Sequence, residues 1–301
     1  MTEPTIEPTF EPTFSIIITT YDRPGPLRAC LAALARSDYP RDRFEVVVVD
    51  DGGPTPLDPV VAEFRDRMAL TLLRQVNAGP ASGRNHGARV ARHAYLAFTD
   101  DDCQPEPGWL SALADGVRAA PEALVGGRTV NGLPGNPYSS ASQLVLDMVY
   151  AFYNADPAAA RFFATNNVAA PADRFREMGG LDETFRVSED REFCDRWRHR
   201  GYPLTYEPRA LVVHRHPLTL SSFWRQHFQY GRGAARFHRA RGARRSGSLQ
   251  EHLGFHLRLP RWWRRARAQG AQPRSALHIL PRVALWQVAN ASGYVCERLG
   301  L

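Results

Sequence analysis

The sequence predicts an α/β protein whose mostly parallel sheet is flanked by helices. Three apolar runs, 14–20, 45–50 and 95–100, read as strands, and each ends in polar or acidic residues. The second run contains four consecutive valines, which is typical of a strand buried on both faces of a parallel sheet. Each run is followed by apolar residues at helical spacing, and strands that alternate with helices predict strand–helix–strand units.

The helices are predicted from stripes of apolar residues spaced three or four positions apart. The stripes are Leu27, Cys30, Leu31 and Leu34, then Val60, Val61, Phe64 and Met68, then Trp109, Leu110, Leu113 and Val117. Ligands of such sheets bind at the carboxyl ends of the strands. The polar residues that end the three runs share this edge, so the sequence predicts a binding site there.

Three consecutive carboxylates, Asp100, Asp101 and Asp102, end the third run. Adjacent negative charges repel one another, so a fold keeps them together where cations or hydrogen bonds compensate. Side chains alternate along a strand, so we expect Asp100 and Asp102 on one side and Asp101 on the other. Two carboxylates on one side suit a hard divalent cation that carries a phosphate. An acidic, solvated turn is the alternative.

The composition is that of an ordinary globular protein, with 301 residues, 44% hydrophobic and 23% charged. The four cysteines have no C-x-x-C spacing, so neither a zinc site nor a disulfide framework is indicated. We expect Cys30 and Cys194 to be small core residues. Neither a signal peptide nor an apolar stretch of spanning length is recognisable, so we expect a reducing, cytoplasmic location.

Charge is distributed unevenly along the chain. All 38 basic residues are arginine, and many lie between Arg225 and Arg274, where the net charge of +7 is concentrated. The first residues repeat the unit Glu-Pro-Thr, and proline at every fourth position disfavours helices and sheets. We therefore expect 1–13 to be a disordered tail.

Two further segments carry polar residues. The glycine-rich stretch 77–87 opens a predicted helix, and its backbone N–H groups, together with Arg84, suit an anionic ligand. Farther on, Ser188, Glu189 and Asp190 precede another predicted helix. Ser188 can cap that helix and the acids can complement its dipole. The alternative is that one of the two acids is a general base.

Taken in order, five motifs resemble those of the family 2 glycosyltransferases of the GT-A type. They are SIIITTYDRP, VVVVDDGG, NAGPASGRNHG, YLAFTDDDCQPEPGWL and GGLDETF with the following SEDREFCDRWRHRG. The resemblance covers 14–217 and implies a GT-A domain there, with a Rossmann-like, mixed and mostly parallel sheet. It leaves 218–301 as an arginine- and aromatic-rich helical extension.

The resemblance also implies an activity. Enzymes of this family transfer a sugar from a nucleotide-diphosphate sugar to an acceptor hydroxyl, here on a glycan such as one of the cell envelope, a lipid-linked molecule or a small molecule. It implies an inverting reaction with Asp190 as the catalytic base. It implies a divalent metal, Mn or Mg, held by the D-x-D residue Asp102 and by His214. The choice between His214 and His216 stays open, and a core or surface histidine without a metal role is the equal alternative.

The donor-binding residues follow from the same resemblance. Asp50 matches the carboxylate that reads the base, Arg84 a contact to the phosphates or base, and Asp100 a contact near the ribose. The full set matched to the nucleotide sugar is Thr19, Tyr21, Arg23, Asp50, Arg84, Asp100 and Asp101. The chemistry agrees, because a sugar hydroxyl needs a base and a leaving diphosphate needs a cation.

Two rival functions make different demands. A sugar nucleotidyltransferase would need a glycine-rich basic loop at the first strand end, and 19–24 does not supply one. A nucleic-acid-binding protein is suggested by the pI of about 9.6. Its main domain should then be basic, whereas the distinctive loops here are acidic, so we expect no nucleic-acid partner.

The C-terminal third has more than one interpretation. The aromatic and basic segment 223–233 suits stacking on bases, packing as a helix on the domain or covering the active site. The resemblance to glycosyltransferases with a Y-G-R-G-like segment here favours a lid near the acceptor. Leu257, Leu259, Trp262 and Trp263 lie among arginines, and an apolar stretch, 276–288, is interrupted by Pro281. This composition is typical of a helix at an anionic membrane surface, which would make the protein peripheral at the inner face of the plasma membrane. Packing on the domain is the alternative.

Overall fold

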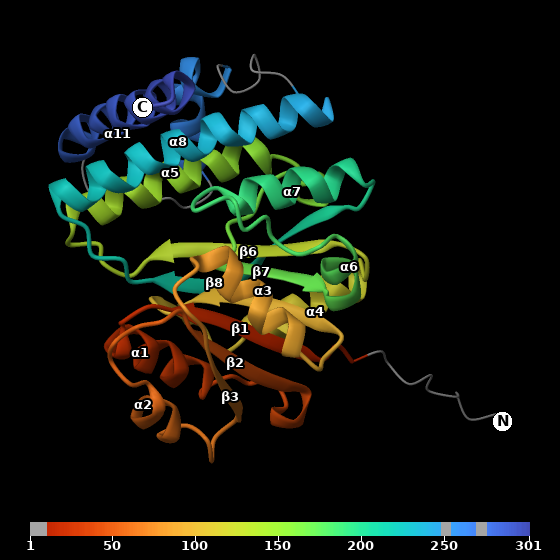
Figure 1. The fold of residues 1–301 in the computed structure, drawn as a ribbon. Helices are drawn as coiled ribbons and strands as arrows, with labels where there is room; N and C mark the ends of the chain where they lie inside the picture. Colours follow the sequence, from red (N-terminus) through yellow and green to blue (C-terminus); the bar gives the residue numbers. More distant parts are fainter. Residues whose placement is uncertain (1–10, 248–253, 269–275) are drawn as a thin grey trace.

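The computed structural model describes residues 11–247, 254–268 and 276–301, and it is an α/β structure built on one eight-stranded sheet (Figure 1). The strand order is β3-β2-β1-β4-β7-β6-β8-β5. Helices cover both faces of the sheet, and a further group of helices lies beyond one side of it. The fold class predicted from the sequence is confirmed.

The first half of the sheet is parallel. β1 (Phe14–Thr20) lies between β2 (Phe44–Asp50) and β4 (Tyr95–Asp100), and β3 (Ala69–Arg74) pairs with the outer side of β2. The first two of these strands are almost wholly buried, as the uninterrupted apolar runs predict. Because the pairing is parallel, Thr20, Asp50 and Asp100 all end their strands at the same edge.

The second half contains the antiparallel pairs. β7 (Asn167–Pro171) runs antiparallel to β4 and to β6 (Leu124–Asn131). β8 (Leu204–His214) is parallel to β6 and antiparallel to the short β5 (Cys103–Pro105). The register sets His214 opposite Cys103. A histidine at the end of β8 is thereby placed beside the three carboxylates.

Two hydrophobic cores lie on the two faces of the sheet. The helices of the first part are α1 (Pro24–Leu34), α2 (Asp58–Ala62), α3 (Pro80–Val90), α4 (Trp109–Ala119) and α6 (Ala172–Glu177), with single 3-10 turns at Arg41–Arg43 and Pro157–Ala159. The three predicted apolar stripes are buried, and so are Cys30 and Cys194. In the second stripe, however, the helix ends at Ala62, and Phe64 and Met68 are buried from the following turns.

The remaining helices form a layer above one edge of the sheet. They are α5 (Pro137–Tyr153), α7 (Glu189–His199), α8 (Leu220–Arg244), α10 (Leu259–Ala268) and α11 (Ala276–Leu299). Figure 1 shows α8 and α11 side by side with α5 beneath them. A Cβ on Gly231 of α8 would meet the carbonyl of Asn290, and a Cβ on Gly293 of α11 would meet that of Phe228. Glycine therefore allows the two backbones to touch.

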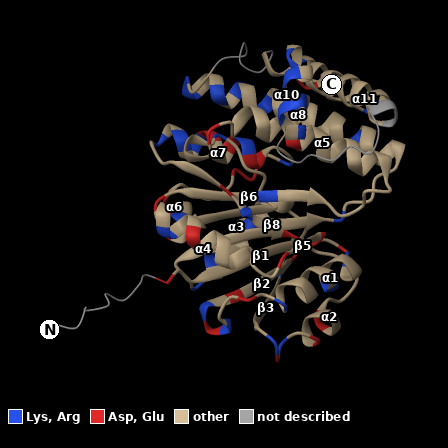
Figure 2. Cartoon of the chain, turned by 180° about the vertical axis from the view of Figure 1, so that it is seen from behind, with Lys and Arg blue, Asp and Glu red and all other residues tan. Residues whose placement is uncertain are grey.

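The C-terminal helices share a core with the rest of the protein. Trp262 of α10 is buried against Phe152 of α5, with ring centroids 4.9 Å apart. For this tryptophan the structure shows the packed arrangement, while Arg258, Arg261 and Arg264 are exposed. Figure 2 shows basic positions, in blue, on α10. Pro281, which interrupts the apolar stretch 276–288, lies inside α11, and the helix continues through it.

The residues just before β1 contact the domain. Residues 1–10 of the predicted tail lie outside the described part, and just before β1 the carbonyl of Pro12 accepts a hydrogen bond of 2.6 Å from Tyr39. Within the described residues, no helix is both long enough and apolar enough to cross a membrane.

Candidate active site

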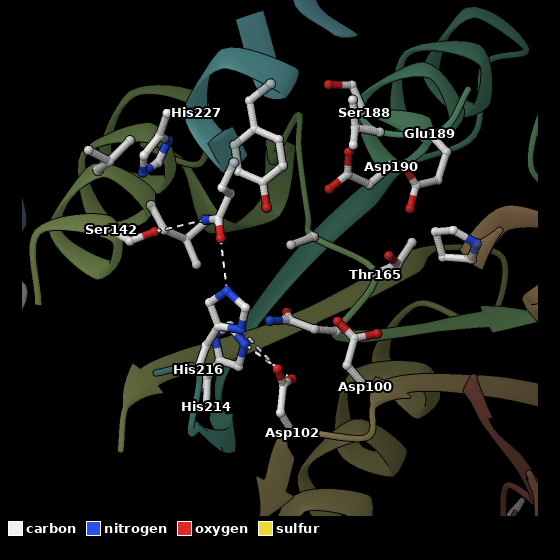
Figure 3. Close-up of a pocket in the computed structure, with 18 of the residues that line it drawn as sticks. Asp100, Asp102, Ser142, Thr165, Ser188, Glu189, Asp190, His214, His216 and His227 are labelled. Atoms are coloured by element: carbon white, nitrogen blue, oxygen red, sulfur yellow. Dashed lines mark hydrogen bonds and ion pairs between the residues drawn. The ribbon is translucent and has the colours of Figure 1, made fainter. Parts of the chain in front are cut away.

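A cavity of about 580 Å³ opens at the carboxyl edge of the sheet, beneath the helical layer. Strand ends form its floor, and α5, α7, α8 and α11 form its walls (Figure 3). All but one of the residues predicted for the site line this cavity. They are Thr19, Tyr21, Arg23, Arg84, Asp100, Asp101, Asp102, Asp190 and His214. The exception is Asp50.

Arg23 holds two of the three consecutive carboxylates. Its guanidinium lies 2.8 Å from Asp101 and 2.9 Å from Asp102, and Thr20 donates a hydrogen bond of 2.7 Å to Asp101. The expected alternation does not extend this far, because β4 ends at Asp100 and the next two residues form a turn. The solvated-turn alternative does not apply either, since Asp101 and Asp102 are only 3% and 7% exposed.

Two histidines converge on Asp102. Nε2 of His214 lies 3.2 Å from one carboxylate oxygen and Nδ1 of His216 lies 3.1 Å from the other. On its far side, His216 contacts Gln226 of α8 at 2.8 Å, and Gln226 donates to Ser142 of α5. Burial alone would raise the pKa of Asp102, but hydrogen bonds from both histidines and the charge of Arg23 hold it far below its usual range.

Arg84 is a buried cation shared by two acids from distant parts of the chain. It lies 2.6 Å from Asp100 and 2.8 Å from Glu189, and it is 4% exposed. Burial opposes its charge, yet the two carboxylates raise the pKa of Arg84 above its ordinary value. Glu189 is therefore committed to an ion pair, which leaves Asp190 as the free acid of the pair.

Asp50 is turned away from the cavity and Asp51 lines it instead. The carboxylate of Asp50 accepts a hydrogen bond of 2.9 Å from the N–H of Gly53, which closes the turn after β2. Asp51 accepts the N–H groups of Ala78 and Gly79, each at 2.9 Å. Asp51, which follows the end of β2, therefore lines the cavity. Asp50, predicted to read the base, does not line the cavity.

The same contacts correct the interpretation of the glycine-rich stretch. Its N–H groups at Ala78 and Gly79 bind the protein's own carboxylate, Asp51, and are thereby occupied. Gly79 has φ +93°, a conformation that side chains other than glycine rarely adopt. The stretch therefore fixes the position of Asp51 at the cavity wall.

Asp190 stands on the opposite wall, at the start of α7. Ser188 makes no side-chain cap, so the capping interpretation fails for that residue. The Asp190 carboxylate accepts only the N–H of Arg191, at 2.7 Å, and within the described residues it has no ion pair. Burial, together with the negative charge of Glu189, raises the pKa of Asp190 to about 7. A carboxyl group with such a pKa is suited to accept a proton near neutral pH.

Several cavity residues were missed from the sequence. Asp51 was passed over in favour of its neighbour, and Gln226, His227 and Tyr230 lie in the aromatic segment whose role was left open. That segment is part of α8, one face of which packs while the other lines the cavity. A helical plot of 223–233 would have placed Gln226, His227 and Tyr230 on one face.

The floor of the cavity fits a divalent cation. Ligand atoms of Asp102, Cys103 and His214 lie within 4.8 Å of one another. A carboxylate and an imidazole are ligands that Mn²⁺ accepts, and a carboxylate suits Mg²⁺. The low pKa of Asp102 keeps that ligand ionised.

Comparison with known proteins gives the family. The model of "Glycosyl transferase family 2" matches residues 15–173, and that of "Glycosyl transferase family group 2" matches 98–294. A "Pre-mycofactocin glycosyltransferase" of Mycobacterium tuberculosis is 31% identical over 70% of this chain and 46% of its own length. A "Validoxylamine A glucosyltransferase" of Streptomyces hygroscopicus is 32% identical over 64% of this chain and 52% of its own length. The chain thus spans about half the length of these relatives.

Solved structures support the fold. A mannosyltransferase from Pyrobaculum calidifontis, in complex with GDP-Man and Mn²⁺, aligns with a TM-score of 0.69 at 20% identity, over 98% of this chain and 89% of its own. S. aureus TarS 1–349 with UDP-GlcNAc aligns with a TM-score of 0.56 at 17% identity, over 96% of this chain and 92% of its own. Together with the family models, this shows that the chain belongs to glycosyl transferase family 2 and has the GT-A fold.

Proposed function

We propose that the chain is an inverting glycosyltransferase that moves a sugar from a nucleotide-diphosphate sugar to an acceptor hydroxyl. The observation that carries the proposal is Asp190, an acid without an ion pair among the described residues, with a pKa raised to about 7. It faces Asp102 and its histidines across one cavity (Figure 3). Base and leaving group on opposite sides of the donor sugar are what a single displacement requires.

Asp190 would accept the proton of the acceptor hydroxyl while that oxygen attacks the anomeric carbon. The bond to the diphosphate breaks on the far side, so one displacement inverts the anomeric centre. A positioned base of this kind contributes about 10²–10⁴ in rate. The raised pKa makes the carboxylate basic enough to take the proton and still largely ionised above neutral pH.

Asp102 and His214 would hold a divalent Mn or Mg ion, and His216 would orient Asp102 from its other oxygen. A bound cation of this kind stabilises negative charge on the leaving diphosphate. The Mn²⁺ in the mannosyltransferase complex supports this assignment by analogy. Cys103 is buried, and burial raises the pKa of its thiol above the ordinary value.

The donor's nucleotide would lie along the strand ends. Thr19, Tyr21 and Asp51 line that part of the cavity, and Tyr21 is 51% exposed. Asp100 would lie near the ribose, and Arg84 would act through Asp100 because its guanidinium is already bound by two carboxylates. Arg23 also pairs with two carboxylates, but unlike the buried Arg84 its side chain is 38% exposed, and it would lie on the phosphate side of the donor.

The rival functions receive no support from the site. A nucleotidyltransferase needs a basic, glycine-rich loop facing the phosphates, whereas the loop before α3 faces the carboxylate Asp51. The nucleic-acid interpretation rested on the pI of about 9.6 and required a basic main domain, whereas the arginines of the cavity floor are paired with carboxylates.

The stereochemistry of the product tests the proposal. We expect proton NMR of a reaction started with an α-linked donor to show a β-linked product as the first anomer formed. The donor is found by a thermal-shift screen of UDP-, GDP- and dTDP-sugars with Mn²⁺ or Mg²⁺, because ligand at 100 times its Kd stabilises by about 2.7 kcal/mol. A product that retains the donor's configuration would contradict direct displacement.

A further inference from the structure

Beyond its charged floor, the cavity continues into an apolar lobe. The lobe is formed by Val145, Leu146, Val149, Phe162, Phe255 and Trp286, from α5, the segment before β7 and the C-terminal helices. Each of these except Leu146 is less than 9% exposed to solvent, yet each lines the cavity. The floor carries carboxylates and cations, so the two ends of the same cavity differ sharply in polarity.

The lobe runs along one face of α5. Ser142, Leu146 and Val149 follow one another at one-turn spacing on that helix. Ser142 is linked through Gln226 to His216, so the lobe starts beside the metal-binding floor. At its other end, the guanidinium of Arg191 lies 5.8 Å from the ring of Phe162. The residue after the proposed base therefore contacts Phe162 of the lobe, and Asp190 lines the same cavity.

A buried polar side chain faces the cavity without a partner. His227 is 1% exposed and lines the cavity, and both of its ring nitrogens lack a hydrogen bond to any residue that the structure describes. Burial lowers the pKa of this histidine to about 4, so the ring is neutral, with one donor and one acceptor nitrogen. Figure 3 shows His227 and Ser142 on the side of the cavity away from Asp190. A polar atom left unpaired in such a place is costly unless a ligand completes it.

We propose that this lobe binds an apolar group of the acceptor, an aromatic ring or short alkyl chain carried next to the reacting hydroxyl. The inference rests on the proposed function and names its acceptor class as small amphipathic molecules. A bare sugar would set several hydroxyls against a wall that offers them few hydrogen bonds, which is unfavourable. An apolar group would instead gain affinity in proportion to the area it buries. Few placed polar groups in a mainly apolar cavity are typical of small-molecule sites.

Two glucosides that differ only in their apolar group test the proposal. Methyl and hexyl β-D-glucoside, below the micellar range of the latter, are titrated into the full chain by calorimetry. Each buried methylene is worth roughly fourfold in affinity, so burial of two or more predicts at least about tenfold tighter binding of the hexyl compound. Equal affinities for the two glucosides would overturn the proposal.

Two variants locate the binding. Leu146→Trp fills the lobe and should abolish the preference for the hexyl compound, whereas Val288→Trp, on an exposed position of α11 (56% exposed), should keep it. If Leu146→Trp fails to fold, Leu146→Asn makes the same wall polar and should reduce the preference at least about fourfold. A preference that survives in the folded Leu146 variant would place the binding elsewhere and overturn the proposal.

The test of the apolar lobe can fail or succeed independently of the test of the proposed glycosyltransferase activity. The glucoside titration measures binding alone and needs no turnover. In one outcome, the protein binds the hexyl compound more tightly through Leu146 and yet transfers no sugar from any nucleotide donor. That result would support the proposed apolar binding lobe and contradict the proposed activity. Inverting transfer without any hexyl preference would sustain the activity and contradict the lobe.

Discussion

The floor of the cavity and the wall that carries Asp190 differ in how they stabilise buried charge. On the floor, Arg23 and Arg84 each bind two carboxylates at 2.6–2.9 Å, and Asp102 is contacted by three positively charged or N–H-donating side chains. On the facing wall, Asp190 has only a backbone N–H within hydrogen-bond distance among the described residues. The pKa values follow this difference, since that of Asp102 is far below its usual range and that of Asp190 is about 7.

This difference shows how one cavity can hold carboxylates for two tasks. A carboxylate surrounded by donors stays ionised and serves as a fixed ligand, whereas a carboxylate left in an apolar setting exchanges protons. In the proposed mechanism the floor binds the metal and the donor, and Asp190 on the facing wall accepts the proton. Four measurements test this difference between the floor and the wall that carries Asp190.

The largest effect is expected from Asp190→Asn. Turnover should fall by about 10²–10⁴, while nucleotide-sugar affinity, measured by calorimetry, should hardly change, because the wall that carries Asp190 does not bind the donor's phosphates. In the wild type, kcat/KM should rise with pH through about 7, since the base works only when deprotonated. Asp173→Asn, on the exposed surface of α6, is the control. Equal losses in donor affinity and turnover would assign Asp190 to the structure of α7 instead.

Arg84→Met tests the floor. Removing this cation leaves Asp100 and Glu189 unpaired and buried or half-buried, which we expect to lower the free energy of unfolding by about 3–5 kcal/mol. Denaturant unfolding followed by tryptophan fluorescence measures the change. The matched control is Arg28→Met, because Arg28 pairs with Glu63 at the exposed surface and should matter little. A floor variant as stable as the control would show that the ion pairs are not structural.

His214→Ala and His216→Ala test which histidine binds the metal and which one orients Asp102. A residue that orients a metal ligand typically contributes 10–100-fold to metal affinity, so we expect that loss from His216→Ala and a larger one from His214→Ala. Electron paramagnetic resonance of free Mn²⁺ measures both. His199→Ala, on an exposed turn of α7, is the control. The reverse order would make His216 the ligand.

The smallest effect concerns the exposed arginines of α10. Changing Arg261 and Arg264 to Glu should weaken binding to anionic lipid vesicles at low salt, at about 1 kcal/mol for each arginine removed from the surface. Sedimentation with vesicles measures it, and neutral vesicles are the control. Trp262→Ala should instead lower stability, because Trp262 packs inside the protein. A wild-type chain that ignores anionic vesicles would remove the membrane interpretation.

The sequence was informative where structure depends on local patterns. Four consecutive valines predict a buried parallel strand because neighbouring strands and helices must cover both of its faces. The stripe beginning at Leu27 predicts a helix for the same kind of reason. Strand ends in a parallel sheet meet at one edge, so the sequence also predicted that Thr19, Asp100 and their neighbours would share a cavity.

Other features depend on distant or subtle geometry. Arg84 and Glu189 are 105 residues apart, and no spacing rule joins them. Whether Asp50 or Asp51 faces the ligand depends on a turn in which Gly52 has φ +83°, and residue types alone do not determine that turn. Trp262 beside arginine has the composition of a membrane helix, yet its indole is covered by an aromatic ring of α5.

The position of α11 has a consequence for biosynthesis. Trp286 completes the apolar lobe, and α11 rests on α8 through the glycine contact at Gly231 and Gly293. A ribosome adds residues at about 5–20 per second, so the sheet can form while α11 is still being made. Until α11 emerges, the apolar face of α5 is left uncovered. A chaperone can bind this uncovered face in the nascent chain, and the cavity is complete only after α11 has been made.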